Sequence, residues 1–299
     1  MQDKQTVGVI GLGSMGAGVA KSLLRAGYPA RVCDTRAEAM AALASEGAIG
    51  CANPAELATA CDIVIVLVVN AAQAEAVLFG KQGAAANLRP GCAVIMSVTI
   101  APDVAIGFAA RLAERGILML DGPVSGGAAK AATGEMTVMA SGAPEVFAKC
   151  EAVLAAIANK VYRLGDAPGA GSRVKMINQL LAGVHIAAAA EAMALGIKAG
   201  ADPEVLYEVI CNSAGGSWMF QNRVPHILAG DYAPLSAVNI FVKDLGIVLE
   251  AAKQSGFPLP LTATAHQMFL MAAAAGLGSE DDSAVVKIYP GVDLPKPKK

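Results

Sequence analysis

The 299-residue sequence is poor in charged, aromatic and histidine residues. Only 16% of its residues are charged and 4% are aromatic, it has one Trp and three His, and its formal net charge is −2. A chain with this charge balance offers no basic surface for nucleic acid or for an anionic membrane. We therefore expect neither of them to be a partner.

Paired cysteines are also lacking. The six Cys are scattered singly among apolar or small residues, with no C-x-x-C pair and no Cys/His spacing typical of a metal site. This pattern favours buried free thiols in a reducing compartment, no metal centre and a cytoplasmic protein. The most apolar run, residues 63–69, is far too short to cross a bilayer.

Apolar residues are abundant instead, at 55% of the chain. The length favours two domains with a large core. Because few charged residues remain to cover the surface, some apolar surface should be buried between subunits. We expect a homodimer or a homotetramer.

The N-terminal stretch, residues 6–36, reads TVGVIGLGSMGAGVAKSLLRAGYPARVCDTR. A short apolar strand is followed by Gly11, Gly13 and Gly16 in the spacing G-x-G-x-x-G, then by a helix and a second strand that ends at Asp34. Glycines at these positions permit a tight turn, close approach of a pyrophosphate and close helix packing. A carboxylate at position 34 can accept hydrogen bonds from ribose hydroxyls. This pattern predicts a dinucleotide site; the alternative is a unit whose glycines serve only packing.

Strands and helices go on alternating up to about residue 166, which is typical of a doubly wound sheet. Strands are expected at 62–69, 93–98, 118–120, 136–141 and 161–164, and a glycine-rich loop at 122–134. After residue 166 only helical patterns follow. The predicted fold is an α/β Rossmann-type dinucleotide-binding domain, residues 1–166, followed by an all-α domain, residues 167–299, for substrate binding and oligomerisation.

A long apolar helix is expected at residues 172–199, and we predict that it is buried on most faces. Lys175 is its only lysine before Lys198, and residues 175, 178 and 179 share one face. Desolvation lowers the pKa of an ammonium toward the range useful for proton transfer. Lys175 is thus a candidate acid/base group, although a lysine near a helix start can also extend its ammonium to solvent.

Two other stretches carry unusual combinations of residues. Ser125-Gly126-Gly127 exposes backbone N–H groups and a hydroxyl, which suits a carboxylate, but the stretch can also be an ordinary loop. Lys243 and Asp244, in FVKDL, can be a solvated ion pair or a cofactor contact, and their spacing alone does not choose.

Taken together, these motifs resemble the β-hydroxyacid dehydrogenase family of the 3-hydroxyisobutyrate dehydrogenase type, over essentially the whole chain. GLGSMGAGVAKSL resembles its cofactor fingerprint, DGPVSGGAAKAATGEM its substrate signature, GAGSRVKMINQ its catalytic helix and FVKDL its second cofactor contact. The resemblance implies that Lys175 is the catalytic lysine and that Ser125, Gly126 and Gly127 hold the substrate carboxylate.

The predicted substrate site also includes Asn178, Gln179 and Trp218, although Trp218 can equally be an ordinary interface aromatic. The family usually has Asn where this chain has Gln179, which puts the usual substrate in question. Residues 185–196 and 215–223 resemble the branch acting on four-carbon sugar acids, the L-threonate dehydrogenases. The predicted cofactor-binding residues are Gly11, Leu12, Gly13, Ser14, Met15, Gly16, Asp34, Leu67, Val68, Thr99, Phe241 and Lys243.

The expected activity is oxidation of a small hydroxy acid, L-threonate or another 3-hydroxyisobutyrate-type substrate, by hydride transfer with Lys175 as acid/base. NAD is expected over NADP because Asp34 would repel a 2′-phosphate, although Arg36 could pair with one. One alternative is a reductase of a small semialdehyde acid, such as tartronate or succinic semialdehyde. Another is a non-catalytic dinucleotide-binding scaffold, which the presence of Lys175 disfavours.

Overall fold

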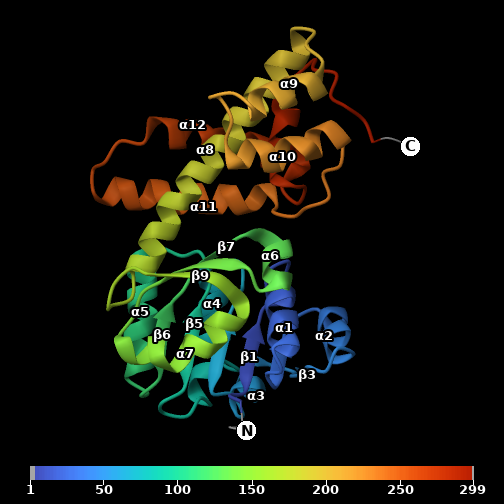
Figure 1. Cartoon of the computed structure of the whole chain (residues 1–299). Helices are drawn as coiled ribbons and strands as arrows, with labels where there is room; N and C mark the ends of the chain where they lie inside the picture. The colour runs from blue at the N-terminus through green and yellow to red at the C-terminus, as the bar shows by residue number, and fades with distance from the viewer. Residues whose placement is uncertain (1–3, 298–299) are drawn as a thin grey trace. The chain divides into compact units, whose positions relative to one another are not determined.

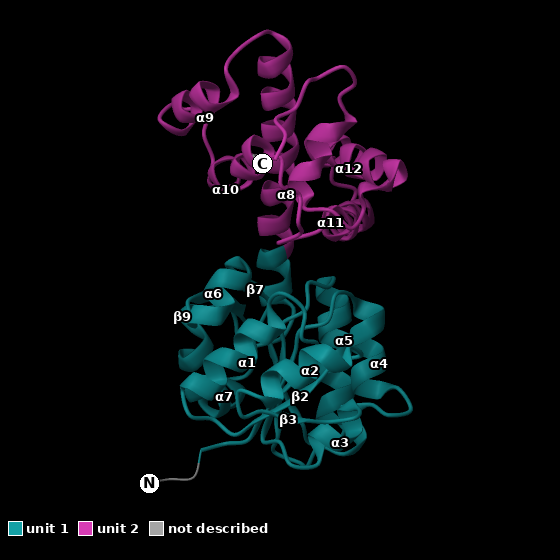
Figure 2. Ribbon diagram, turned by 90° about the vertical axis from the view of Figure 1, so that its right-hand side faces the viewer, with its two compact units in different colours: residues 1–175 teal, residues 176–299 magenta. Residues whose placement is uncertain are grey.

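The computed structural model describes residues 4–297. The chain divides into two compact units, residues 1–175 and residues 176–299 (Figure 2). The predicted fold class is confirmed, because a parallel α/β unit is followed by a helical unit. The division falls inside a long helix, whereas the domain boundary predicted at residue 166 precedes that helix and stays a prediction.

The first unit is built on a six-stranded parallel sheet in the order β3-β2-β1-β4-β5-β6 (Figure 1). Val9 of β1 lies between Val32 of β2 and Ile65 of β4, in register. Strand order reverses beside β1, and ligands of such sheets bind at the carboxyl ends of the strands at this point. The strands are β1 (Val7–Ile10), β2 (Ala30–Cys33), β3 (Ile49–Gly50), β4 (Ile63–Val66), β5 (Ala93–Met96) and β6 (Leu118–Asp121).

Apolar residues on both faces of the strands bury the sheet between two layers of helices. Alternate residues of β4 show this, since Ile63 and Ile65 pack in one core cluster and Val64 and Val66 in the other. One layer is formed by α1 (Gly16–Arg25), α2 (Ala37–Ala44) and α7 (Pro144–Ile157). The other is formed by α3 (Pro54–Ala58), α4 (Ala71–Phe79), the short 3₁₀ helix at Ala84–Ala86 and α5 (Pro102–Ala113).

A second, three-stranded sheet in the order β7-β8-β9 completes the first unit. The prediction of a continuous loop over residues 122–134 is wrong, because this stretch contains a strand and a helix. Gly126 and Gly127 have φ values of +136° and +75°, and this left-handed backbone turns the strand directly into the helix. The elements are β7 (Val124–Ser125), α6 (Gly127–Thr133), β8 (Met136–Ala140) and β9 (Ala158–Arg163).

The second unit is helical, and its core is formed largely by α8, α10, α11 and α12. A buried ion pair joins α10 to the last 3₁₀ helix, since Arg223 Nε donates to Asp282 Oδ1 at 2.6 Å. Burial raises the pKa of Asp282 to about 6, despite the opposing effect of Arg223. The elements are α8 (Ala170–Lys198), α9 (Pro203–Cys211), α10 (Trp218–Ala229), α11 (Val238–Gln254), α12 (Pro260–Ala272), a π-helical turn at Ala273–Leu277 and a 3₁₀ helix at Asp282–Ile288.

Helix α8 is less buried than its composition predicts. It has 29 residues, and its most apolar window has a mean hydropathy of 1.8, which by length and composition alone would also suit a membrane span. Only 39% of that window is buried, so the prediction that most faces are covered is wrong for a single chain. Ile177, Leu181 and Leu195 remain 50%, 50% and 69% exposed.

The glycine-rich turn yields a prediction about stability. A Cβ added at Gly16 would lie 1.8 Å from the backbone oxygen of Gly11, whereas one added at Gly107, inside α5, would meet no heavy atom within 4 Å. Gly16→Ala should therefore lower the free energy of unfolding by at least about 1–3 kcal/mol. The control Gly107→Ala should raise it by roughly 0.4–1 kcal/mol, since alanine restricts the unfolded chain. Urea unfolding of both variants checks this, and equal stabilities would contradict it.

Candidate functional site

The turn between β1 and α1 has the shape that a pyrophosphate requires. Gly11 has a φ of +91°, and a Cβ there would lie 2.7 Å from the carbonyl oxygen of Leu67. Gly13 is exposed, and no heavy atom would lie within 4 Å of a Cβ added to it. Helix α1 begins three residues later, and N–H groups at a helix start favour an anion. Backbone can therefore approach a phosphate at Gly13 without obstruction.

Asp34 lies directly after β2, at the carboxyl edge of the sheet. Its Oδ2 accepts from the backbone N–H of Leu12 at 2.6 Å, which ties the acid to the glycine-rich turn. Its Oδ1 accepts from the backbone N–H and from Nε of Arg36, at 2.9 Å and 3.1 Å. Burial acts to raise the pKa of Asp34, but these hydrogen bonds outweigh it and hold the pKa below its usual value. Asp34 is thus an ionised acceptor of the kind that binds ribose hydroxyls.

Arg36 is engaged by the same turn. Its guanidinium donates to Asp34 and, through Nη2, to the carbonyl oxygen of Leu12 at 2.9 Å. The Arg36 guanidinium, which could pair with a 2′-phosphate, is therefore already hydrogen-bonded to Asp34 in this structure. The glycine turn, the start of α1 and Asp34 fit a dinucleotide.

The remaining predicted cofactor residues of the first unit lie at or after the same strand ends. Ser14 and Met15 precede α1, Leu67 and Val68 follow β4, and Thr99 follows β5. Ser14 is exposed and the other four are half-buried. The structure places these residues at one edge of the sheet, and their contacts with a cofactor stay predictions.

Ser125 is the last residue of β7, Gly127 is the first residue of α6, and Gly126 joins them. Ser125 and Gly126 are half-buried and Gly127 is exposed. A Cβ added at Gly127 would meet no heavy atom within 4 Å, so the backbone there is open to a ligand. Their positive φ values disfavour any side chain at 126 and 127. The geometry suits the predicted carboxylate-binding role.

Lys175 lies in the second turn of α8 and is only 7% exposed. Gln179 follows one turn later on the same face and is also buried. The Gln179 amide is oriented by its neighbours, because its Nε2 donates to Asp244 Oδ2 at 2.6 Å and its Oε1 accepts from Asn178 at 3.0 Å. The amide oxygen is thereby directed away from Asp244.

Asp244 contributes to this site through a contact with Gln179 that the FVKDL motif does not predict. Its side chain is 1% exposed, and it binds both Gln179 and the ammonium of Lys243, the latter at 2.5 Å. The interpretation of Lys243 and Asp244 as a solvated ion pair is therefore wrong. The spacing of α11 could have revealed this, because Phe241, Asp244, Leu245 and Val248 recur on one buried face.

Phe241 and Trp218 are placed very differently within the helical unit. Phe241 is 3% exposed and its ring stacks on Phe269 with centroids 5.2 Å apart, so the structure gives it a packing role. Trp218 is 59% exposed in the first turn of α10, after the N-cap Ser217. The predicted cofactor contact of Phe241 and substrate contact of Trp218 stay predictions.

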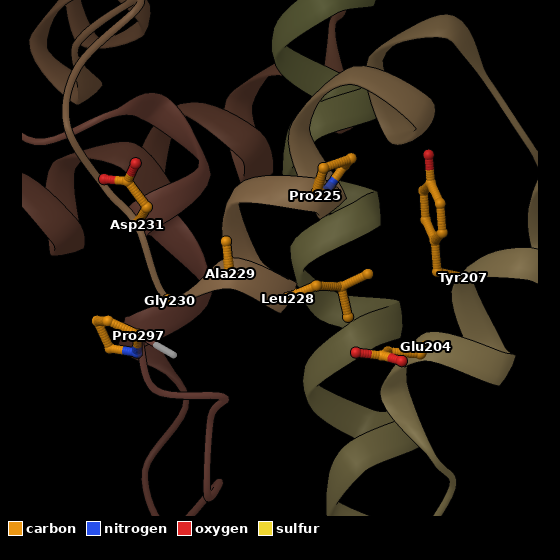
Figure 3. A pocket seen from close by; sticks show the side chains of 8 residues that line it. All are labelled: Glu204, Tyr207, Pro225, Leu228, Ala229, Gly230, Asp231 and Pro297. Carbon is orange, nitrogen blue, oxygen red and sulfur yellow. The ribbon is translucent and has the colours of Figure 1, made fainter. Parts of the chain in front are cut away.

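An open pocket of about 600 Å³ lies elsewhere in the helical unit, between α9, the end of α10 and Pro297 (Figure 3). It is lined mainly by apolar side chains and by the two acids Glu204 and Asp231. None of the predicted site residues lines it. Residues 4–297 contain no group of three or more His, Cys, Asp or Glu that could hold a metal ion.

Two protein-family models match the chain in succession. The NAD-binding domain of 6-phosphogluconate dehydrogenase matches residues 6–165, and the NAD-binding region of NADP-dependent 3-hydroxyisobutyrate dehydrogenase matches residues 169–289. The chain belongs to the 3-hydroxyisobutyrate dehydrogenase-like family. This confirms the resemblance drawn from the four motifs.

Individual relatives agree with this assignment. L-threonate dehydrogenase of Cupriavidus necator is 65% identical, over 97% of this chain and 98% of its own. The Escherichia coli K12 enzyme of the same name is 56% identical, over 98% and 97%. A crystal structure described as 3-hydroxyisobutyrate dehydrogenase from Salmonella typhimurium is 55% identical, has a TM-score of 0.92, and aligns over 96% of this chain and 100% of its own. The chain is thus an NAD-binding hydroxyacid dehydrogenase, as expected, and its substrate is a hydroxy acid.

Proposed function

We propose that this enzyme oxidises L-threonate at C2 with NAD. The observation that carries the proposal is the 65% identity, over nearly the full length of both chains, to a relative named L-threonate dehydrogenase. The crystal structure at 55% identity carries a different name, 3-hydroxyisobutyrate dehydrogenase, and makes that branched hydroxy acid the competing substrate. A reductase of a small semialdehyde acid is the same chemistry in the opposite direction.

In this proposal Lys175 is the acid/base group. Oxidation of a carbinol removes a hydride and the hydroxyl proton, and the bound dinucleotide supplies the hydride-accepting chemistry. The proton passes to Nζ of Lys175, a residue that is only 7% exposed. Ser125, Gly126 and Gly127 bind the substrate carboxylate through the hydroxyl and backbone N–H groups.

Gln179 and Asn178 orient the substrate hydroxyl. The Asp244 carboxylate accepts from Gln179 Nε2, and this contact fixes which end of the amide is the donor and which the acceptor. Support for this role comes from the burial of Gln179, the partial burial of Asn178 and their position about one turn beyond the lysine. Lys243, paired with Asp244, and Thr99 are assigned to the cofactor by the family resemblance.

The cofactor is NAD rather than NADP, because the ionised Asp34 would lie beside a 2′-phosphate and repel it. The enzyme is soluble and cytoplasmic, which accords with buried free thiols at Cys33, Cys61 and Cys150.

The chain assembles as a homodimer or homotetramer through the helical unit. Support comes from large apolar side chains that one chain leaves exposed there, among them Leu195 at 69%, Val205 at 57%, Phe257 at 65% and Leu261 at 71%. Val205 and Val209 lie one turn apart on α9, of which no residue is buried. A second copy of the same unit would cover such faces.

The substrate and the acid/base group can be tested together. Wild type should turn over L-threonate with a higher kcat/KM than 3-hydroxyisobutyrate or any semialdehyde acid in a panel followed by NADH absorbance. Lys175→Ala should lower kcat by about 10²–10⁴-fold while leaving dinucleotide binding nearly intact. Lys175→Arg should not restore activity, since guanidinium does not release its proton at useful pH. A Lys175→Ala variant that retains more than about a tenth of wild-type kcat would remove the lysine from this role.

The cofactor preference is tested at Asp34. Wild type should have the higher kcat/KM with NAD, and Asp34→Ser should narrow or reverse the ratio by removing the repulsive charge and releasing Arg36. Arg36→Ala is the matched control, which should leave NAD preferred. A wild-type preference for NADP would show that Arg36 and not Asp34 decides.

The assembly is tested by light scattering at micromolar concentration. The mass of one chain is 30.1 kDa, and the measured mass should be two or four times this value. Leu195→Asp should shift the distribution toward monomer, whereas the control Ile49→Asp, at an exposed position of the first unit, should not. A monomer mass for wild type would contradict the proposal.

A further inference from the structure

The start of α8 is held by a carboxylate from a distant part of the chain. Asp121, the last residue of β6, is fully buried. Its Oδ2 accepts from the backbone N–H groups of Gly169 and Ser172, each at 2.9 Å, and its Oδ1 accepts from the Ser172 hydroxyl at 2.6 Å. The helix that carries Lys175 thus begins on an acid that lies about fifty residues earlier in the chain.

Ser141 completes this arrangement. Its hydroxyl donates to Asp121 Oδ2 at 3.2 Å and accepts from the backbone N–H of Gly171 at 2.9 Å. The backbones of Asp121 and Ser141 also exchange hydrogen bonds, at 3.0 Å and 2.8 Å. The N–H groups of Gly169, Gly171 and Ser172 are therefore satisfied by Asp121 and Ser141, which belong to the ends of two different strands, and not by a local cap.

The first turn of α8 packs so closely against neighbouring backbone that it has no room to shift toward the strands. A Cβ added at Gly171 would lie 2.4 Å from the carbonyl oxygen of Met139 and 2.7 Å from that of Asp121. Glycine is required here because the first turn of α8 rests directly on the backbone of β8 and β6. Asp121, Ser141, Gly171 and Ser172 form what we call the helix seat.

Lys175 is three residues beyond Ser172, so one turn of α8 separates the lysine from the seat. A helix turn is stiff, and a shift or tilt at its first residues moves Nζ of the lysine with it. Misplacement of a reacting group by about 1 Å can lower the rate by about 10²-fold. The accuracy with which the helix seat holds the first turn of α8 therefore determines how accurately the Lys175 ammonium is placed.

We propose that Asp121 is a positioning residue of the enzyme, acting through Lys175. With Ser141 and Ser172 it fixes the first turn of α8 on the sheet and thereby the place of the lysine ammonium. This inference rests on the proposed role of Lys175. The alternative is that Asp121 only stabilises the fold, as any buried, hydrogen-bonded carboxylate does.

A matched control for that alternative exists in the helical unit. Asp281 is also fully buried and accepts from the backbone N–H groups of Leu235 and Ser283, at 3.0 Å and 3.1 Å, and from the Ser283 hydroxyl at 2.6 Å. Asp281→Asn and Asp121→Asn each place an amide where a carboxylate accepts hydrogen bonds from several donors. Their thermal stabilities should fall by comparable amounts.

The test is a double-mutant cycle on kcat, measured with L-threonate and NAD at saturation. Asp121→Asn should lower kcat by about 10–10²-fold in the wild-type background and by less than about threefold in Lys175→Ala, because it acts through the lysine. Asp281→Asn should change kcat by less than about twofold. Equal losses from Asp121→Asn in both backgrounds, or a loss no larger than that of Asp281→Asn, would overturn the proposal.

Hydrogen exchange separates this proposal from the proposed function. Asp121→Asn should speed exchange at the amides of Gly169, Gly171 and Ser172, whatever the role of Lys175. If Lys175→Ala stays active, the proposed function fails, and the exchange result still shows whether Asp121 holds the start of α8. If exchange at these amides is unchanged in Asp121→Asn, the helix seat itself is overturned. Should Asp121→Asn fail to fold, Ser172→Ala removes one hydrogen bond of the seat and should lower kcat by about three- to tenfold, and an unchanged kcat would overturn the proposal.

Discussion

The structure depends on one buried carboxylate, that of Asp121. It ends the last strand of the six-stranded sheet, pairs through its backbone with Ser141 after β8, and accepts the N–H groups at the start of α8. Three elements therefore meet on one side chain. Because a buried acid with four donors cannot be moved without leaving several of them unpaired, this junction tolerates little displacement.

Buried or largely buried carboxylates also hold two other segments of the proposed site. Asp34 ties the glycine-rich turn to the end of β2, and Asp244 orients the Gln179 amide from α11. In each case a carboxylate that is largely removed from solvent accepts short hydrogen bonds from groups far away in the sequence. A chain with only 25 acidic residues uses several of them in this way rather than on its surface.

Local order and fold class could be predicted from the sequence because they depend on short-range signals. The run of β-branched residues at 63–66 marks a buried strand, and the spacing of Gly11, Gly13 and Gly16 marks the turn into α1. A glycine-rich loop is the wrong prediction for residues 122–134, because the left-handed backbone of Gly126 and Gly127 joins a strand directly to a helix. The two-residue strand β3 is too short to leave a pattern.

The site was predicted less completely, for a physical reason. The contacts of Asp121 with Ser172 and of Gln179 with Asp244 join residues 51 and 65 positions apart, and no local periodicity records them. The motifs identified Lys175, the glycines and Asp34, but not the roles of Asp121 and Asp244 as hydrogen-bond acceptors. The exposure of α8 could not be predicted either. An apolar helix is expected to be buried, but its sequence does not show whether the same chain or a second one packs against it.

The central claim is that a buried lysine accepts the proton as the hydroxy acid is oxidised. Single-turnover rates of NADH formation, measured across pH with L-threonate and with L-threonate deuterated at C2, test it most directly. We expect a deuterium effect in wild type and a rate that rises with pH through one ionisation, and this pH dependence should disappear in Lys175→Ala. The same pH profile in both proteins would contradict it.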